Sequence, residues 1–224
     1  MFRKAAVLLL LAAATPGCVP RPALLPSTEA VIADVRFLAN YNLEGRATGS
    51  RGSDRAATFI MQRYKTLGVS GAFPALCYGD ALHCDAEFFQ SFTVAQGRAK
   101  NVGALIPGTD SVLRNKYVVV GAHYDHIGHS PYLSLDPEAG DATRPGADDN
   151  ASGTLGLKPR YSTEIEARSD HASFRSGGVP AIALFTGFHS DYHRVTDVPR
   201  KIDARGIEQI ADLTEGVLRA VADR

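Results

Sequence analysis

Three short apolar runs constrain the fold of this chain more than any other feature. They lie at residues 102–106, 117–120 and 179–185, and each ends at a turn or at a polar cluster. Runs of this length favour buried strands over helices. Segments of helical periodicity, such as residues 53–64 and 207–221, flank them. Helices around buried strands indicate an α/β fold, and we expect a three-layer α/β/α sandwich with a mostly parallel central sheet.

The beginning of the chain has the pattern of an export signal. Arg3 and Lys4 precede an apolar run at residues 5–14, and small residues then lead to Cys18. The alternative, a buried N-terminal helix, would have no polar face. We therefore expect residues 1–17 to be a signal peptide. Because the small residues end in a cysteine, the segment resembles a bacterial lipoprotein signal, in which Cys18 is lipidated.

Residues 18–27 contain three prolines and read as an extended linker to a single domain at residues 28–224. The first apolar run is too short to cross a bilayer as a helix in the mature protein. We therefore expect an exported protein of the periplasm or cell envelope. Its attachment to the membrane would be through a lipid at Cys18 alone.

Charge and cysteine usage narrow the function further. The 24 Lys and Arg residues balance 24 Asp and Glu residues, so bulk charge does not attract nucleic acid. With Cys18 lipidated, Cys77 and Cys84 remain as a closely spaced pair in an oxidising compartment, where we expect a disulfide. Their spacing does not match a CxxC zinc or redox site.

Histidines and carboxylates gather after the expected strands. Six of the seven histidines lie within residues 123–193. His123 and Asp125 follow the second run, at the strand end where ligands bind in open α/β sheets. They have the spacing of a metal ligand and a carboxylate that orients it, and His193 with Asp197 repeats the arrangement.

A second acidic cluster, GADDNASG, lies at residues 146–153. Adjacent carboxylates between glycines are typical of a turn or of a calcium-type loop. An acidic residue in this cluster could equally bridge two cations, because a carboxylate has two oxygens that can each hold an ion.

Six motifs, in this order, resemble the bacterial di-zinc aminopeptidase family, whose relatives include glutamate carboxypeptidase II and the glutaminyl cyclases. They cover most of residues 29–224 and are EGRATGSRG (44–52), NVGALIPG (101–108), VVVGAHYDHIG (118–128), GADDNASG (146–153), SDHASF (169–174) and GVPAIALFTGFHSDYHRVTD (178–197). The resemblance implies that His123 binds one zinc ion, that His193 binds the other and that Asp149 bridges them. It also implies that Asp125 orients His123, and that the two ions activate a water and polarise the scissile carbonyl of a peptide.

The chain departs from the family between Gly153 and Ser169. Only the fifteen residues TLGLKPRYSTEIEAR separate them. The family has here a helix and two strands that carry a pair of adjacent glutamates and an aspartate, namely the general base and two metal ligands. A single βαβ unit needs about thirty residues or more. We therefore expect a sandwich truncated in its middle, with residues 154–160 marking the shortened part, and with no general base.

Glu164 and Glu166 are two residues apart and do not match the adjacent pair. The remaining set of two histidines and one aspartate could hold a single zinc ion with an open position. We therefore expect two zinc ions by resemblance to the family, but one or none in this chain. A lost proton acceptor typically slows hydrolysis by about two to four orders of magnitude.

We expect an exported, zinc-dependent hydrolase of the metallopeptidase type, most similar to an aminopeptidase, that acts on peptides and is impaired as written. Three alternatives stay open. They are a non-catalytic binding protein of the cell envelope with the same fold, a glutaminyl cyclase-like enzyme, and an internal deletion in the sequence that leaves no folded product.

Overall fold

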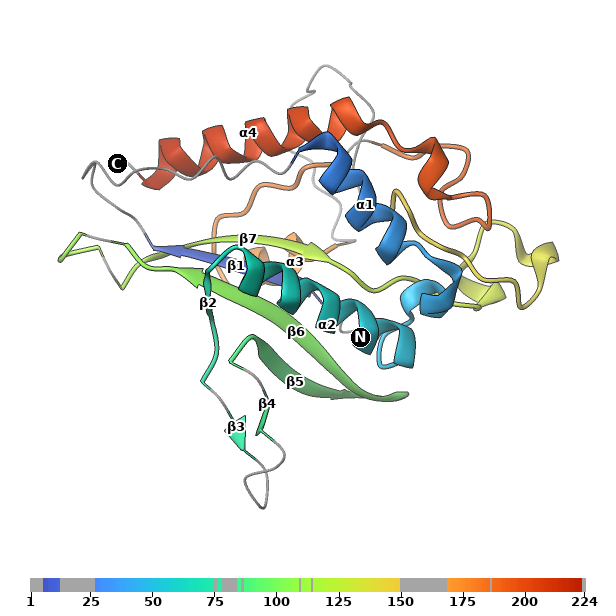
Figure 1. Ribbon diagram of the computed structural model, residues 1–224, viewed down its shortest axis with the longest axis horizontal. Helices are drawn as coiled ribbons and strands as arrows, with labels where there is room; N and C mark the ends of the chain where they lie inside the picture. The colour runs from blue at the N-terminus through green and yellow to red at the C-terminus, as the bar shows by residue number, and fades with distance from the viewer. Residues whose placement is uncertain are drawn as a thin grey trace.

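The computed structural model (Figure 1) describes residues 6–12, 27–74, 76–77, 84–85, 87–108, 110–113, 115–149, 169–185 and 187–222. The α-helices are α1 (Thr28–Leu38), α2 (Arg51–Thr66), α3 (His171–Ser176) and α4 (Ala204–Ala222). The strands are β1 (Ala6–Ala12), β2 (Ser70–Gly71), β3 (Leu76–Cys77), β4 (Cys84–Asp85), β5 (Phe89–Val94), β6 (Gly97–Ile106) and β7 (Tyr117–His123). Short 3-10 helices are η1 (Tyr41–Arg46), η2 (Pro131–Leu133), η3 (Pro137–Ala139) and η4 (Pro199–Lys201). A sheet with helices packed on it confirms the expected α/β class.

The main sheet has the strand order β2-β6-β1-β7, and β5 also pairs with β6. The expectation of a mostly parallel sheet is wrong for the described strands. Only β1 and β6 run parallel, whereas β1 with β7, β2 with β6 and β5 with β6 are antiparallel. The connections explain the difference. A two-residue turn joins β5 to β6, and the ten residues between β6 and β7 are fewer than a parallel crossover needs.

The expected signal peptide contains the central strand of this sheet. All seven residues of β1 pair with β7, and residues 7–11 also pair with residues 102–106 of β6. A run of aliphatic residues is well suited to a strand that has a neighbour on each side. In the chain that retains residues 6–12, β1 therefore covers one edge of β6 and one edge of β7. Cys18 and most of the expected linker lie outside the described residues.

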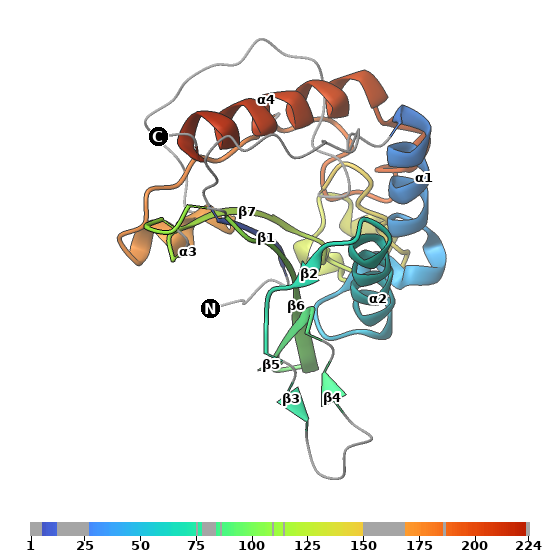
Figure 2. The ribbon, with the colours of Figure 1, turned by 60° about the vertical axis from the view of Figure 1, so that its left-hand side comes forward.

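The helices α1, α2 and α4 lie on one side of the sheet (Figure 2). The Ser50 side chain caps α2 by accepting a hydrogen bond from the backbone N–H of Ser53 (3.1 Å). The main hydrophobic core joins α2 to β6 and to neighbouring loops. It comprises Leu43, Ala56, Ala57, Ile60, Phe88, Val102, Ala104 and Tyr124. Within the described ranges, the six-residue α3 is the one further α-helix, so the expected second helical layer is not found there.

A second, smaller core lies between α1 and α4. It contains Val35 and Ala39 of α1, with Ile202 and Ile207 from the C-terminal part. Ala147, which immediately precedes the acidic pair at residues 148–149, is fully buried in this core. The apolar packing of α1 and α4 therefore fixes the backbone from which the two aspartates project.

Two segments that we expected as buried strands are more exposed than the sequence suggests. Residues 118–120 of β7 are only half-buried. Residues 179–185 form no strand, and Ile182 and Phe185 are 72% and 65% exposed. An apolar run becomes a buried strand only when neighbours cover its faces and edges, and the described residues provide few such neighbours here.

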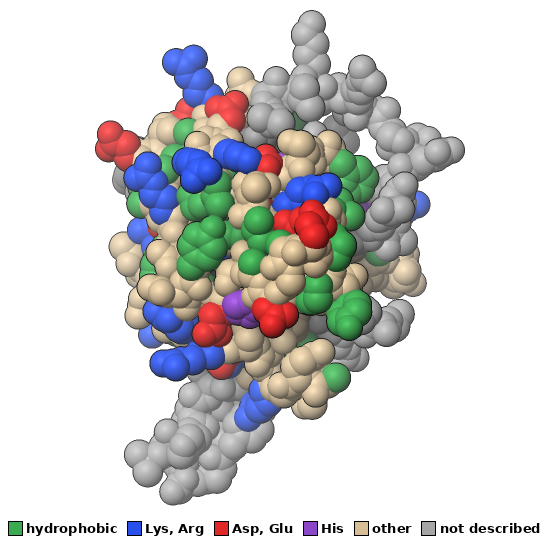
Figure 3. All heavy atoms as spheres, turned by 90° about the vertical axis from the view of Figure 1, so that its right-hand side faces the viewer, with side chains coloured by type: hydrophobic (Ala, Val, Ile, Leu, Met, Phe, Trp, Pro, Cys, Tyr) green, Lys and Arg blue, Asp and Glu red, His purple; other side chains and the backbone are tan. Residues whose placement is uncertain are grey.

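The surface shows no separation of charge on the face seen in Figure 3, where acidic and basic side chains are interspersed with hydrophobic ones. Among the described residues, no helix combines the length and the apolar composition that a membrane crossing requires.

The two cysteines expected to form a disulfide lie opposite each other in the small β3–β4 sheet, where Cys77 pairs with Cys84. Opposite Cα atoms in an antiparallel pair are about 4.5–5.5 Å apart, within the range that a disulfide spans. The backbone register is therefore compatible with the disulfide, which stays a prediction.

Candidate metal centre

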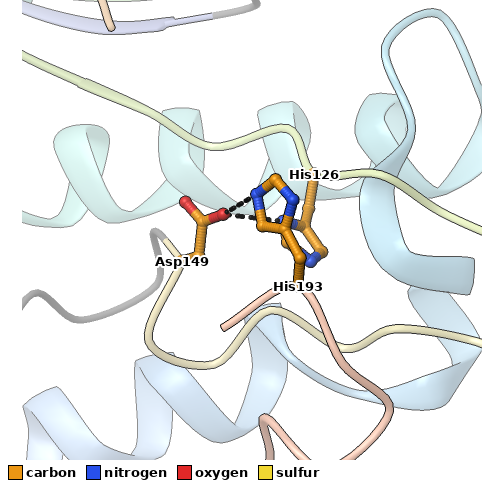
Figure 4. A group of neighbouring side chains, drawn as sticks. All are labelled: His126, Asp149 and His193. Carbon is orange, nitrogen blue, oxygen red and sulfur yellow. Dashed lines mark ion pairs between the residues drawn. The ribbon is translucent and has the colours of Figure 1, made fainter. Parts of the chain in front are cut away.

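The candidate site lies at the end of β7, where the sequence analysis expected it. Three segments meet there: residues 123–126 at the end of β7, the acidic loop at residues 146–149, and residues 189–197 before η4. The carboxylate of Asp149 lies in the middle, and His126 and His193 point toward it (Figure 4). The ligand atoms of these three side chains lie within 4.8 Å of one another.

The two oxygens of Asp149 face different imidazoles. Its Oδ1 is 3.5 Å from Nε2 of His123. Its Oδ2 is 2.7 Å from Nε2 of His193 and 3.5 Å from Nδ1 of His126. The structure thus brings together the three expected ligands, with the aspartate between the two expected histidines. It adds His126, which we did not expect.

Backbone carbonyls orient the two expected histidines. Nδ1 of His123 is 2.9 Å from the carbonyl oxygen of Asp125, and Nδ1 of His193 is 2.8 Å from that of Leu133. A ring nitrogen that faces a carbonyl carries the proton, so Nδ1 is the donor in both rings. Each Nε2 is directed at Asp149. This is the arrangement in which a protein holds metal-ligating histidines.

Asp125 lies beside His123, as the sequence analysis expected. Its Oδ1 is 3.5 Å from Nδ1 of His123, so the backbone carbonyl of the same residue makes the closer contact. Its Oδ2 accepts a short hydrogen bond from the hydroxyl of Thr48. Asp125 is buried and is fixed by the glycine-rich segment that precedes α2.

The structure corrects the role expected of Asp197. We expected its carboxylate to orient His193, but the Leu133 carbonyl takes that place. Asp197 is instead buried beneath the acidic loop. It accepts hydrogen bonds from the backbone N–H groups of Asp148 (2.8 Å) and Asp149 (3.2 Å). It therefore positions the bridging aspartate rather than a histidine.

Sequence reasoning missed His126 and His189. His126 is buried, and its Nε2 has no hydrogen-bond partner among the described groups. His189 lies at the rim, where its Nε2 is 2.7 Å from Oδ2 of Asp148. The sequence did carry a signal for His126. It lies three residues after His123 in the same motif, close enough to reach the same strand end.

Burial and neighbouring charges set the ionisation of the site. Burial by itself would raise the pKa of Asp149, but its interactions with the imidazoles of His126, His193 and His123 outweigh burial and lower the pKa below its usual value. Asp149 is therefore a carboxylate at neutral pH. Burial lowers the pKa of His126, against the opposing effect of Asp149, so this imidazole is neutral at pH 7. A carboxylate and a neutral imidazole are the forms that bind a metal ion.

Arg46 is the main support beneath the site, and its role was not expected from the sequence. Its guanidinium is fully buried and donates hydrogen bonds to backbone carbonyls of three separate segments. They are those of Leu38, Tyr124 (2.7 Å), Pro145 (2.7 Å) and Gly146 (2.9 Å). Burial lowers the pKa of Arg46 to about 10, opposed by the nearby Asp149, Asp125 and Asp197, so the side chain stays charged at pH 7.

A second buried arginine holds the His193 segment. Nε of Arg144 is 3.0 Å from Oδ1 of Asp136, whose Oδ2 accepts a hydrogen bond from the backbone N–H of Val195 (2.8 Å). The backbone of His193 has a φ of 54°, in the left-handed region that residues other than glycine rarely adopt. The clamp at Val195 helps to keep His193 in this conformation.

The donor set fits zinc. Imidazole nitrogens together with carboxylate oxygens are its usual ligands in catalytic sites, at about 2.0–2.2 Å from the ion. Ligand atoms at that radius around a tetrahedral ion lie about 3.3–3.6 Å apart. Two of the three nitrogen–oxygen separations around Asp149 are 3.5 Å. The third, to His193, is 2.7 Å and would have to widen around an ion.

Two segments of the chain, residues 101–158 and 155–218, match the model of Peptidase family M28. Together they cover just over half of the chain. The first segment contains His123, His126 and Asp149, and the second contains His193. Searches of curated proteins and of solved structures gave no significant match.

Proposed function

The chain belongs to peptidase family M28, and from this membership we propose that it is a zinc-binding, metallopeptidase-like protein of the aminopeptidase type. The observation that carries the proposal is the placement of Asp149 between the imidazoles of His123, His126 and His193. The proposed reaction is slow hydrolysis of the N-terminal peptide bond of a peptide.

The residues of the chain have distinct parts in this reaction. When bound, zinc supplies Lewis-acid chemistry that polarises a carbonyl and makes water a better nucleophile at neutral pH. His193 and Asp149 would hold it, and Asp197 keeps the backbone of Asp149 in place. The negative charges of Asp148 and Asp149 favour the cationic amine end of a peptide over its anionic carboxylate end. This supports a substrate that presents its N-terminus.

The absent glutamate pair sets the expected rate. Among the described residues, the carboxylates that meet at the site are all aspartates: Asp125, Asp148, Asp149 and Asp197. Each is bound to a histidine, to a threonine or to backbone N–H groups. Without a dedicated proton acceptor, the rate would be about two to four orders of magnitude below that of a relative with the glutamate. The break of the family match at residues 155–158 supports this account, because the shortened segment lies there.

The test uses the zinc-loaded full chain and a matched pair of substrates, leucine p-nitroanilide and its N-acetyl derivative. We expect slow, chelator-sensitive hydrolysis of the free amine substrate alone. Asp149→Asn should abolish it. His129→Ala should not, because His129 is exposed and its Nδ1 faces the carbonyl of Asp141 instead. Release of p-nitroaniline that is insensitive to chelator or to Asp149→Asn would contradict the proposal. Tight zinc binding without any hydrolysis would favour the non-catalytic binding protein.

We also propose that the protein is exported and carries a lipid at Cys18. The charged and then apolar start of the chain supports this. Incorporation of a labelled fatty acid in a bacterial host, lost in Cys18→Ser, would be the expected result. Full-length protein that stays in the cytoplasm without a label would contradict it.

A further inference from the structure

We propose that His126 is a metal ligand, and that the chain holds one zinc ion through His126, Asp149 and His193 in place of the pair that the family resemblance implies. The inference rests on the proposed function insofar as both need a metal at Asp149. It goes further in naming a ligand that the family resemblance does not supply and in fixing the number of ions.

The two oxygens of Asp149 have different surroundings. Its Oδ2 faces two imidazoles, those of His126 and His193, whereas its Oδ1 faces His123. Three protein ligands and an open position form the usual catalytic zinc site. On the Oδ1 side the described part of the chain brings only two groups, His123 and Asp149 itself. Within the part of the chain that the structure describes, the Oδ2 side of the carboxylate therefore has the three-ligand set of a zinc site.

The distance between His126 and Asp149 suits two ligands of one ion. Nδ1 of His126 is 3.5 Å from Oδ2 of Asp149. This is long for an N–H···O hydrogen bond, whose usual length is about 2.9–3.0 Å. It matches the separation of about 3.3–3.6 Å between two ligands of one tetrahedral zinc ion. The His126 and His193 rings meet edge to face, at 81° and 5.4 Å between centroids, so both nitrogens can approach the same point.

His126 lies in surroundings that leave its imidazole with few polar contacts. The imidazole is buried and its Nε2 has no hydrogen-bond partner among the described groups. Buried polar atoms normally have partners, so a buried imidazole with one weak contact is poorly satisfied as it stands. A cation between Nδ1 and Asp149 gives this ring a strong interaction that the protein groups do not provide.

Gly146 makes the space that the ring of His126 occupies. A Cβ at residue 146 would lie 2.6 Å from Cγ of His126 and 2.5 Å from the backbone oxygen of Asp149. The φ of Gly146 is 58°, which also favours glycine. The backbone N–H of His126 is fixed in turn by a hydrogen bond to the carbonyl of Arg46 (3.1 Å). The acidic loop and the His126 ring therefore fit together only because residue 146 lacks a side chain.

The experiment measures metal binding by the full chain, independently of hydrolysis. Zinc per chain is determined after dialysis, and affinity is determined by calorimetry. The absorption spectrum of the cobalt(II) form reports the coordination number. We expect one ion per chain, and a loss of affinity of about 100-fold or more in His126→Ala and in His193→Ala. His123→Ala should keep one ion, with affinity within a few-fold, and His129→Ala serves as the exposed control.

His126→Cys guards against misfolding as the cause of a loss, because a thiolate is also a zinc ligand. It should retain binding with a changed cobalt spectrum. Two tightly held ions, or unchanged affinity and spectrum in His126→Ala, would overturn the inference. Zinc binding that needs His126 without peptidase activity would support the inference and contradict the proposed function. Hydrolysis that is unchanged in His126→Ala would support the proposed function and contradict the inference.

Discussion

The buried guanidinium of Arg46 allows a quantitative test of how the site is supported. It donates to carbonyls on both sides of the site, including those of Tyr124 and Gly146, and also binds Leu38 and Pro145. Arg46→Met keeps most of the apolar stem and removes every one of these donors. Three buried carbonyl oxygens and one partly buried one then lose a charged partner, and three buried or half-buried aspartates lose a nearby positive charge.

The magnitude follows from these contacts. A hydrogen bond to a charged group contributes about 1.5–3 kcal/mol, and the contributions within one network are not additive. Breaking a buried charged network typically costs about 3–5 kcal/mol. That is a large part of the free energy of unfolding of an ordinary domain, about 5–15 kcal/mol. With a urea m-value of about 2 kcal/mol/M, the midpoint should fall by about 1.5–2.5 M.

The assay is urea unfolding of the metal-free chain, followed by circular dichroism. Arg55→Met is the matched control, because Arg55 is exposed and donates one hydrogen bond, to the carbonyl of Asn42 (2.9 Å). The free energy of unfolding of Arg55→Met should differ from that of the unsubstituted chain by no more than about 0.5 kcal/mol. If Arg46→Met behaved like Arg55→Met, the site would not depend on this arginine and the reasoning would fail.

Three further predictions concern other parts of the molecule. Acidification of the metal-free chain should lower its stability as the pH falls below about 6.5, because His126 has a lowered pKa and the unfolded chain then binds more protons. In His126→Ala the urea midpoint should change less between pH 7 and pH 5, and the same change as in the unsubstituted chain would contradict this. Cys77→Ala should cost about 2–3 kcal/mol in the oxidised protein and nothing in the reduced protein, and free thiols at both positions in the native exported protein would refute the disulfide. Deletion of residues 2–17 should expose edges of β6 and β7 and cause self-association in light scattering, whereas a monomer with unchanged stability would show that β1 is dispensable.

Residues 6–12 belong both to the expected signal peptide and to strand β1. A signal peptide is removed on export, but residues 6–12 pair with both β6 and β7. An aliphatic run satisfies both uses, since neither requires a polar side chain. Export and strand formation would therefore compete for this segment, and the deletion measures what the sheet loses when export removes it.

Much of the site was accessible from the sequence because its chemistry is local. His123 follows an apolar run directly, and Asp149 lies between glycines in a loop that cannot form a regular helix. These positions could be placed at a strand end without knowledge of the sheet. Whether β7 runs parallel to its neighbours could not be derived, because an apolar run has the same pattern in either direction.

The parts that the sequence did not reveal depend on contacts with the backbone. Arg46 binds carbonyls, which every residue has, so no partner side chain in the sequence points to it. Asp197 likewise binds backbone N–H groups, so no partner side chain in the sequence points to its role. It was assigned to the nearest histidine instead. His126 was overlooked because it shares a motif with His123, and its place beside Asp149 becomes visible only in the fold.

The central claim, that Asp149 and its histidines form a metal centre, is tested most directly by X-ray absorption spectroscopy at the zinc edge of the dialysed full chain. The account predicts one zinc per chain with two imidazole nitrogens, from His126 and His193, and with oxygen ligands that include Asp149. A shell of oxygens without imidazole, or a chain that retains no zinc, would contradict it.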